Sequence, residues 1–314
     1  MRVVSLLPAA TDIVAALGAG DTLVGRTHEC DWPPDLVRNL PVVTVADAAP
    51  DACSREITRG HTGSSVFHLD PAALAALAPD VILTQDLCDV CAVPYRAVNE
   101  AVRVLDLDTT VLSLEAGTVS GILDSVDAVA ARLGVSEAAQ RLRADLTARL
   151  DALPGAAAWR AYPPAGDADR LPGACLPAAG SGPTVLFVEW LDPFMPGGHW
   201  VPEQILLAGG QPVLLGPGEH SVAHLWPAVL DCGPEVVVLG PCGLSRDRTL
   251  ADLGALTALP GWADLPAVRD GQVWVVDGPA YFNRPGPRVI DGAEILTEVL
   301  AGTVRHERAI RLSA

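Results

Sequence analysis

Residues 2–25 read RVVSLLPAATDIVAALGAGDTLVG, and this stretch decides the fold class. The apolar run Val3–Leu7 precedes a proline and a Thr-Asp pair that can cap a helix, and Gly18 and Gly20 end the helical pattern. Leu23 then begins a second short apolar run. A strand, a helix and a strand in this order are typical of a parallel sheet with helices on its faces.

The same alternation of short apolar runs and helical patterns continues along most of the chain. The expected strands are Leu23–Thr27, Val42–Val45, Val81–Thr84, Thr110–Leu114, Thr184–Glu189, Pro212–Leu215, Val236–Gly240 and Gln272–Asp277. The expected helices lie near Pro71–Pro79, Tyr95–Arg103, Val201–Ala208, Ala223–Leu230, Leu250–Leu259 and Arg288–Leu300. The sequence therefore predicts an α/β protein with mostly parallel sheets.

The middle of the chain separates two such sets of elements. Residues 117–153 are rich in Ala, Leu, Arg and Asp at helical spacing with a break at Gly134, which predicts one long helix or two coaxial helices. Residues 154–183 are rich in Ala, Gly and Pro, as is typical of a surface linker. We therefore expect an N-terminal lobe over residues 1–116 and a C-terminal lobe over residues 184–314. Two lobes braced by one long helix should close only modestly on a ligand.

Charge argues against nucleic acid as a partner, and the lengths of the apolar runs argue against a membrane span. The chain has 21 Lys and Arg residues against 38 Asp and Glu residues, a formal net charge of −17. Such a surface repels a phosphate backbone, and no run of Lys or Arg offers a local basic patch, so nucleic acid is not expected as a partner. No stretch of about 18 apolar residues is present, so no membrane span is expected.

The opening residues and the cysteines bear on the compartment. Val3–Leu7 is too short for the apolar core of a signal peptide, and it lacks a basic flank and a small-residue cleavage site. We therefore expect a cytoplasmic protein, extracytoplasmic only if a leader was removed. In the cytoplasm its seven cysteines would be mostly reduced. We expect three of them, Cys53, Cys175 and Cys232, to be small buried or loop residues without a functional role.

Polar loops follow the predicted strands in both halves of the chain. In open α/β sheets, ligands bind outside the carboxyl ends of the strands, where neighbouring loops converge. Two loops from each lobe carry Cys or Trp beside charged residues and therefore predict one shared ligand cleft. They are THECDWP (27–33), QDLCDVC (85–91), EWLDP (189–193) and GPCG (240–243).

Five segments together resemble one known family. They are RVVSLLPAATDIVAALGAGDTLVG (2–25), THECDWP (27–33), LTQDLCDVCAV (83–93), VEWLDPFMPGGHWVPE (188–203) and AYFNRPGPRVIDGAEIL (280–296). The chain resembles the cobalamin-binding branch of the helical-backbone metal receptor superfamily, the substrate-binding proteins of class III ABC importers. The resemblance covers nearly the whole chain except residues 156–182, and the Cys- and His-bearing loops resemble a leaderless subgroup of that branch.

The resemblance implies two Rossmann-like lobes joined by a long backbone helix. It implies a small-molecule or metal-chelate ligand, cobalamin or a related corrinoid, clamped between the lobes, and an ABC permease as partner. Trp32, Trp190 and Trp200 could supply aromatic faces for a flat macrocycle, although Trp190 and Trp200 could instead cover the lobe cores. Further ligand-binding candidates in the same loops are Glu189, His199, Phe282, Asn283 and Arg284.

The cysteines support a second interpretation. His28 and Cys30 are two residues apart, so in an extended segment both side chains lie on one face, and Cys88 and Cys91 have the spacing that lets both sulfurs bind one metal. This Cys₃His set would suit zinc or another thiophilic metal in an intracellular sensor, carrier or structural-metal protein. Further ligands from the C-terminal lobe could be Cys242 and His199.

A third hypothesis is an enzyme that uses a metal or a reactive cysteine in the cleft. No Ser-His-Asp or paired-carboxylate motif stands out, so no catalytic residue is assigned and a binding protein is favoured over an enzyme. The remaining histidines are expected to have no functional role; they are His61, His68, His220, His224 and His306.

Overall fold

The computed structural model describes residues 1–46, 52–60, 67–85, 95–104, 108–162, 175–176 and 180–312. The chain forms two compact units, each an α/β structure built on its own sheet, which confirms the predicted fold class. Unit 1 comprises Met1–Ala52, Arg59–Ala116 and Ser120–Leu146, and unit 2 comprises Cys53–Thr58, Gly117–Val119 and Thr147–Ala314. None of the described helices is long and apolar enough to cross a membrane.

The sheet of unit 1 has four parallel strands in the order β2-β1-β5-β6. Every residue of β1 and β5 is buried, as a parallel sheet covered on both faces requires. A separate antiparallel pair, β3 with β4, belongs to the same unit. The strands are β1 (Val3–Ser5), β2 (Leu23–Arg26), β3 (Thr44–Ala46), β4 (Phe67–Leu69), β5 (Val81–Thr84) and β6 (Thr110–Ser113).

Helices cover this sheet, and local sequence explains where two of them begin. Pro8 occupies the first turn of α1, where a missing N–H costs nothing. The Asp70 side chain caps α4 by accepting a hydrogen bond of 3.0 Å from the Ala73 amide. The helices are α1 (Pro8–Ala16), η1 (Gly20–Thr22), α2 (Pro34–Val37), α4 (Pro71–Leu77), α5 (Tyr95–Val104), α6 (Val119–Leu133) and α7 (Ser136–Ala152).

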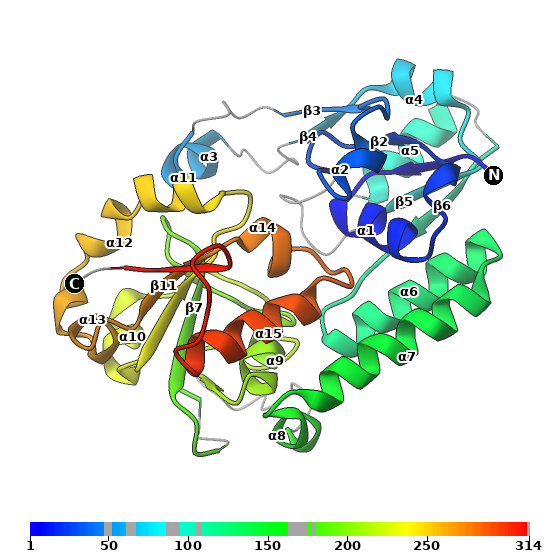
Figure 1. Cartoon of the computed structure of the whole chain (residues 1–314). Helices are drawn as coiled ribbons and strands as arrows, with labels where there is room; N and C mark the ends of the chain where they lie inside the picture. The colour runs from blue at the N-terminus through cyan, green and yellow to red at the C-terminus, as the bar shows by residue number, and fades with distance from the viewer. Residues whose placement is uncertain are drawn as a thin grey trace. The chain divides into compact units, whose positions relative to one another are not determined.

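The helical stretch in the middle of the chain folds back on itself. Gly134 has φ of 73°, a left-handed conformation that reverses the chain between α6 and α7. Arg143 of α7 bonds Asp127 of α6 at 2.6 Å and Asp124 at 3.1 Å, which coaxial helices could not allow, and Figure 1 shows the two helices side by side. The coaxial alternative is therefore wrong. The expected backbone helix is α7, whose residues 136–146 belong to unit 1 and whose last turns belong to unit 2.

The sheet of unit 2 is centred on three parallel strands, β7, β10 and β11. β12 and β8 add antiparallel edges, and the short β9 pairs with β7 in parallel. The expected strand Pro212–Leu215 is reduced to β9, which pairs only through Gln211 and Pro212. The strands are β7 (Thr184–Trp190), β8 (Met195–Pro196), β9 (Gln211–Pro212), β10 (Val236–Leu239), β11 (Val273–Val276) and β12 (Ala309–Arg311).

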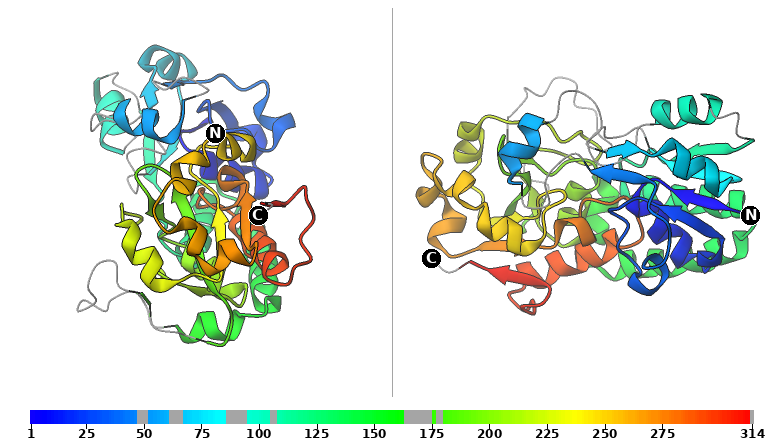
Figure 2. Two further views of the ribbon diagram at one scale, coloured as in Figure 1. Left: turned by 90° about the vertical axis from the view of Figure 1, so that its left-hand side faces the viewer. Right: turned by 90° about the horizontal axis from the view of Figure 1, so that it is seen from above.

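Alternate residues of β7 serve the two faces of this sheet. Leu186 and Val188 pack in one apolar cluster with Val229 of α10, whereas the Phe187 ring lies 4.9 Å from that of Phe282 on the other side. Both views in Figure 2 place α10 and α15 on opposite sides of the strands. The helices are α8 (Ala156–Ala161), α9 (Val201–Leu207), α10 (Trp226–Cys232), α11 (Arg246–Ala251), α12 (Gly254–Thr257), η2 (Trp262–Asp264), α13 (Pro266–Arg269), α14 (Gly278–Tyr281) and α15 (Val289–Leu300).

Part of one early helix also belongs to unit 2. Residues 53–58, most of α3 (Ser54–Gly60), were expected in the N-terminal lobe. The Ser54 amide donates to Asp252 Oδ2 at 2.9 Å, and the Arg55 guanidinium bonds the Asp192 carboxylate. These bonds, rather than sequence position, fix the place of the segment.

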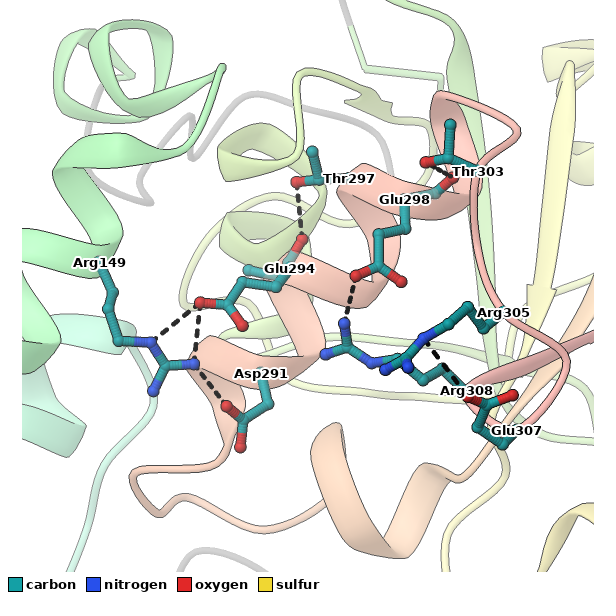
Figure 3. Close-up of polar contacts among 10 residues, drawn as sticks. Arg149, Asp291, Glu294, Thr297, Glu298, Thr303, Arg305, Glu307 and Arg308 are labelled. Carbon is teal, nitrogen blue, oxygen red and sulfur yellow. Dashed lines mark hydrogen bonds and ion pairs between the residues drawn. The ribbon is translucent and has the colours of Figure 1, made fainter.

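The end of α7 is fastened to α15 by one arginine. The Arg149 guanidinium bonds Glu294 Oε1 at 2.9 Å and also the Asp291 carboxylate (Figure 3). All three side chains are about one-third exposed, so each pair contributes at most about 1 kcal/mol. The pairs therefore orient the last turns of α7 within unit 2 more than they stabilise the unit.

A buried carboxylate joins α6, α8 and α9 within unit 2. Glu203 of α9 is 6% exposed, and its Oε2 accepts a 2.6 Å hydrogen bond from the amide of Val119, the first residue of α6. Its Oε1 accepts a 2.7 Å bond from the Trp159 indole of α8. Burial raises the pKa of Glu203, and the two bonds act in the opposite direction.

Glu203→Ala should lower the free energy of unfolding by about 1–3 kcal/mol, because the buried Val119 amide and the partly buried Trp159 indole lose their acceptor. The raised pKa of Glu203 means that the folded protein holds a proton more tightly than the unfolded chain. Wild-type stability should therefore fall as pH rises from the unfolded pKa through the folded one. Urea unfolding at several pH values should show the largest wild-type advantage in acid. An advantage that grows with pH would contradict the assignment.

The Ala/Gly/Pro-rich stretch is tied to unit 2 by a disulfide. Cys175 and Cys232 are bonded, with their Cα atoms 5.5 Å apart, and the Leu176 amide donates to the Val213 carbonyl at 2.8 Å. The expectation that the cysteines are mostly reduced is wrong for these two. The physical reason is that Cys175 lies beside Cys232, the last residue of α10, where the two side chains meet.

Reduction of this disulfide should destabilise unit 2, by about 2–4 kcal/mol for a loop closed over 57 residues. Peptide mapping without reductant should recover the Cys175 and Cys232 peptides as one linked species. Cys232→Ser should unfold at lower urea than wild type, and the two should coincide in the presence of reductant. Recovery of alkylated Cys175 from unreduced wild type would refute the bond.

Candidate functional site

The loops at the carboxyl ends of the unit 2 strands are bonded to one another. The Cys242 amide, after β10, donates to the Glu189 carbonyl at 2.9 Å near the end of β7. The Asn283 side-chain amide, after β11, donates to the Gly240 carbonyl at 3.3 Å. The expected convergence of polar loops at this edge is thus present within unit 2.

The loop before α9 holds His199 in an unusual backbone conformation. His199 has φ of 54°, a left-handed conformation that is costly for a residue with a side chain. Its amide donates to the Glu219 carbonyl at 2.6 Å, and its carbonyl accepts from the Gly218 amide at 2.8 Å. A Cβ atom on Gly198 would lie 2.5 Å from the Glu219 carbonyl oxygen. Glycine at this position therefore allows the two loops to pair closely.

Four side chains form a polar chain across these loops. Ser221 Oγ lies 2.8 Å from Glu189 Oε2 and accepts a 2.9 Å bond from the Gly198 amide. It is also 3.5 Å from His199 Nδ1, and His199 Nε2 lies 3.2 Å from His220 Nδ1. Burial first, and then the neighbouring His220, lower the pKa of His199 to about 4. His199 is therefore neutral at physiological pH and offers a nitrogen lone pair.

Trp190 ends β7 with its indole N–H already bonded. The N–H lies 2.9 Å from Thr58 Oγ1 and 3.1 Å from the Asp192 carbonyl, both in unit 2. The side chain is partly exposed. These bonds hold the edge of the indole and fix its orientation.

The other candidates at this edge are more deeply buried. Trp200 is 5% exposed and donates its N–H to the Phe282 carbonyl at 2.7 Å, and Phe282 itself is fully buried against Phe187. Arg284 is 8% exposed. Trp200 is therefore a core residue, which was the alternative to a ligand-binding role, and Phe282 packs beside it.

The described metal-ligand candidates of unit 1, His28 and Cys30, contact threonine side chains. Cys30 is 1% exposed, and its Sγ lies 3.0 Å from Thr11 Oγ1 and 3.2 Å from Thr27 Oγ1. His28 Nδ1 lies 2.8 Å from Thr44 Oγ1, and burial lowers the pKa of this histidine. The hydroxyls of Thr11 and Thr27 contact the Cys30 thiol, which is part of the interior of unit 1.

Two further predictions concern unit 1 and the thiols. Trp32 is 44% exposed. Cys88 and Cys91 lie outside the described residues, and Cys242 belongs to unit 2. Among the residues that the structure describes, no group of three or more His, Cys, Asp or Glu is placed to hold a metal ion. The Cys₃His site stays a prediction.

The sequence did not single out Ser221, which links Glu189 to His199, or His220, which contacts His199. The expected strand Pro212–Leu215 precedes both residues, but the loop after it carries no Cys or Trp and so did not match the other candidate loops. One signal was present: both histidines follow glycines, in GGHW (197–200) and GPGEHS (216–221). Glycine-rich loops that each carry a histidine can approach closely enough to pair them.

The sequence pattern of the periplasmic binding protein family matches residues 3–158. This chain belongs to the periplasmic binding protein family. A relative in that family, the vitamin B12-binding protein of Vibrio cholerae, is 24% identical over 294 residues, which cover 93% of this chain and 86% of the relative.

Two solved structures share the fold of this periplasmic binding protein family member. The periplasmic vitamin B12-binding protein of Vibrio cholerae superposes with a TM-score of 0.64 at 20% identity, covering 96% of this chain and 97% of that one. A periplasmic heme-binding protein of Pseudomonas aeruginosa gives 0.67 at 21% identity, covering 99% and 95%. The likeness extends over both units and establishes the fold.

Gly198→Ala should disturb the site, because the added methyl group would meet the Glu219 carbonyl oxygen at 2.5 Å. We expect a loss of about 1–3 kcal/mol in the free energy of unfolding. Thermal unfolding measures it, and Gly254→Ala is the control, because its Cβ would have no neighbour within 4 Å. Equal stability of the two variants would show that the loops pair less closely than described.

Proposed function

We propose that this chain is the substrate-binding protein of an importer and that it binds a corrinoid or a related metal chelate. The observation that carries the proposal is the carboxyl edge of the unit 2 sheet. There, Trp190, whose indole N–H is bonded in place, follows Glu189 in the chain, and the Glu189 carboxylate is linked through Ser221 to two imidazoles. A chelate has both an apolar ring and polar substituents, and such a surface offers partners to each.

Trp190 supplies the aromatic part of this surface and Glu189 a polar part. The indole is held at its N–H by Thr58 and Asp192, so little rotamer freedom remains to be lost when a flat ligand packs on it. Glu189 accepts a bond from Ser221 and can accept others from amide or hydroxyl groups of a ligand. In unit 1 the exposed Trp32 is the matching aromatic candidate.

Vitamin B12-binding and heme-binding proteins with the same fold support a tetrapyrrole-like ligand without selecting one. Asn283 and Arg284, which follow α14, are proposed as further polar contacts of the ligand. Arg284 could contact the ligand only after a local rearrangement, because it is 8% exposed. The thiol-metal and enzyme hypotheses stay predictions, and no contact among the described residues favours either over ligand binding.

We further propose an ABC permease as partner and an extracytoplasmic place of work. The Cys175–Cys232 disulfide supports this compartment, because such bonds persist in oxidising surroundings. Relatives whose titles call them periplasmic support the same compartment. This compartment differs from the cytoplasmic expectation, in which the cysteines would be mostly reduced.

Titration of the purified protein with cyanocobalamin and, separately, with hemin tests the function. We expect one equivalent of one of these ligands to bind, detected by quenching of tryptophan fluorescence and by the ligand's visible spectrum. Trp190→Ala should weaken binding by roughly tenfold, the effect of losing one aromatic contact of about 0.5–1.5 kcal/mol together with its buried area. Trp32→Ala should act in the same direction.

The matched control is Trp274→Phe, a change in a 7% exposed tryptophan of β11. It should leave the affinity unchanged. If neither ligand binds at micromolar concentration, or if Trp190→Ala binds as tightly as the control, the proposed ligand surface is wrong.

A further inference from the structure

His199 and His220 form a pair of neighbouring imidazoles in unit 2. His199 Nε2 and His220 Nδ1 are 3.2 Å apart, their rings are nearly perpendicular at 80°, and both lie in unit 2. The ring centroids are only 5.0 Å apart, closer than a straight N–H···N bond would hold them. The contact is therefore bent, which makes it a poor hydrogen bond.

The same separation suits two ligands of one metal ion. Imidazole nitrogens bind zinc at about 2.0–2.1 Å, and in a tetrahedral site two of them then lie about 3.3–3.4 Å apart. Opening the observed pair by a few tenths of an ångström would reach that geometry. His220 is exposed, so an ion can approach from solvent, while the more buried His199 is fixed by its loop.

The groups behind His199 set its tautomer. A Ser221 hydroxyl that donates to Glu189 leaves its oxygen to accept from His199 Nδ1–H, although that contact is long at 3.5 Å. The Nδ1–H tautomer places the lone pair of His199 on Nε2, facing His220. A carboxylate that acts through a hydrogen bond on the far nitrogen is the arrangement that orients metal-binding histidines.

The backbone at His199 is costly and is maintained by specific bonds. A left-handed residue with a side chain persists only where its surroundings impose it, and such residues cluster at functional sites. Here the imposing contacts are the two backbone bonds to Glu219 and Gly218 and the bond from Gly198 to Ser221. They bring His199 to His220.

We propose that His199 Nε2 and His220 Nδ1 together bind a first-row transition metal that has open coordination positions. Binding needs no redox step: the proton on His220 moves to Nε2 through solvent, and each ring gives one lone pair. Two protein ligands leave the remaining positions to water or to a ligand. The metal could come as a free hydrated ion or as the centre of an open-faced chelate, and only the second source rests on the proposed function.

The first arm of the test uses Co²⁺ alone, on the full chain with its free thiols alkylated. Wild type should bind one ion per chain with visible d–d bands, and His199→Asn and His220→Asn should each lose it. Asn is chosen for position 199 because it tolerates a left-handed backbone. His306→Asn, an exposed histidine elsewhere in unit 2, is the control and should bind as wild type does. Ser221→Ala should weaken binding by about tenfold.

The second arm uses hemin, whose iron has exchangeable axial positions. If the chelate is the source, the wild-type complex should show the shifted Soret band of an imidazole-bound iron, lost in both Asn variants but kept in the control. A signal in either arm with this mutational pattern supports the pair and identifies the source. No Co²⁺ binding, together with a hemin spectrum that the Asn variants leave unchanged, overturns it. In that result, retained hemin binding would leave the proposed function standing. Co²⁺ binding without binding of hemin or cyanocobalamin would support the histidine pair and contradict the proposed function.

Discussion

The parallel strands of unit 2 must be covered on both faces, because a parallel sheet lacks a face that can be left to water. Along β7, Leu186 and Val188 serve one layer and Phe187 serves the other. The connections between these parallel strands bring the chain back to the amino edge of the sheet each time. The loops that leave β7, β10 and β11 therefore all lie at the carboxyl edge. The polar residues of the site are gathered there because the apolar residues of the strands are buried.

Features that depend on apolar periodicity could be predicted from the sequence. β7, α9 and α15 lie within a few residues of their expected bounds, since burial determines both the pattern and the element. Features that depend on a single distant partner could not. The reversal at Gly134 is a matter of one positive φ, and the partner of Cys175 lies 57 residues away. The place of α3 depends on bonds from Ser54 and Arg55 to aspartates that no spacing relates to them.

For the candidate site, too, one part could be predicted from the sequence and another part could not. Its location at the carboxyl edge follows from topology, but the role of each side chain depends on neighbours in space. Trp190 and Trp200 are ten residues apart, yet one ends a strand and is partly exposed, while the other donates into the core to Phe282. His220 lies in a loop without Cys or Trp, and only the paired loops reveal its contact with His199.

The bond between Cys175 and Cys232 makes the intervening chain a covalent ring. β7, β8, α9, β9 and α10 all lie within it, and so do Glu189, His199 and Ser221. A single peptide bond broken anywhere in this ring would open it without separating the two pieces. The loops that carry Glu189, His199 and Ser221 therefore belong to a covalent ring, and they stay joined after one proteolytic cut that would divide an ordinary chain.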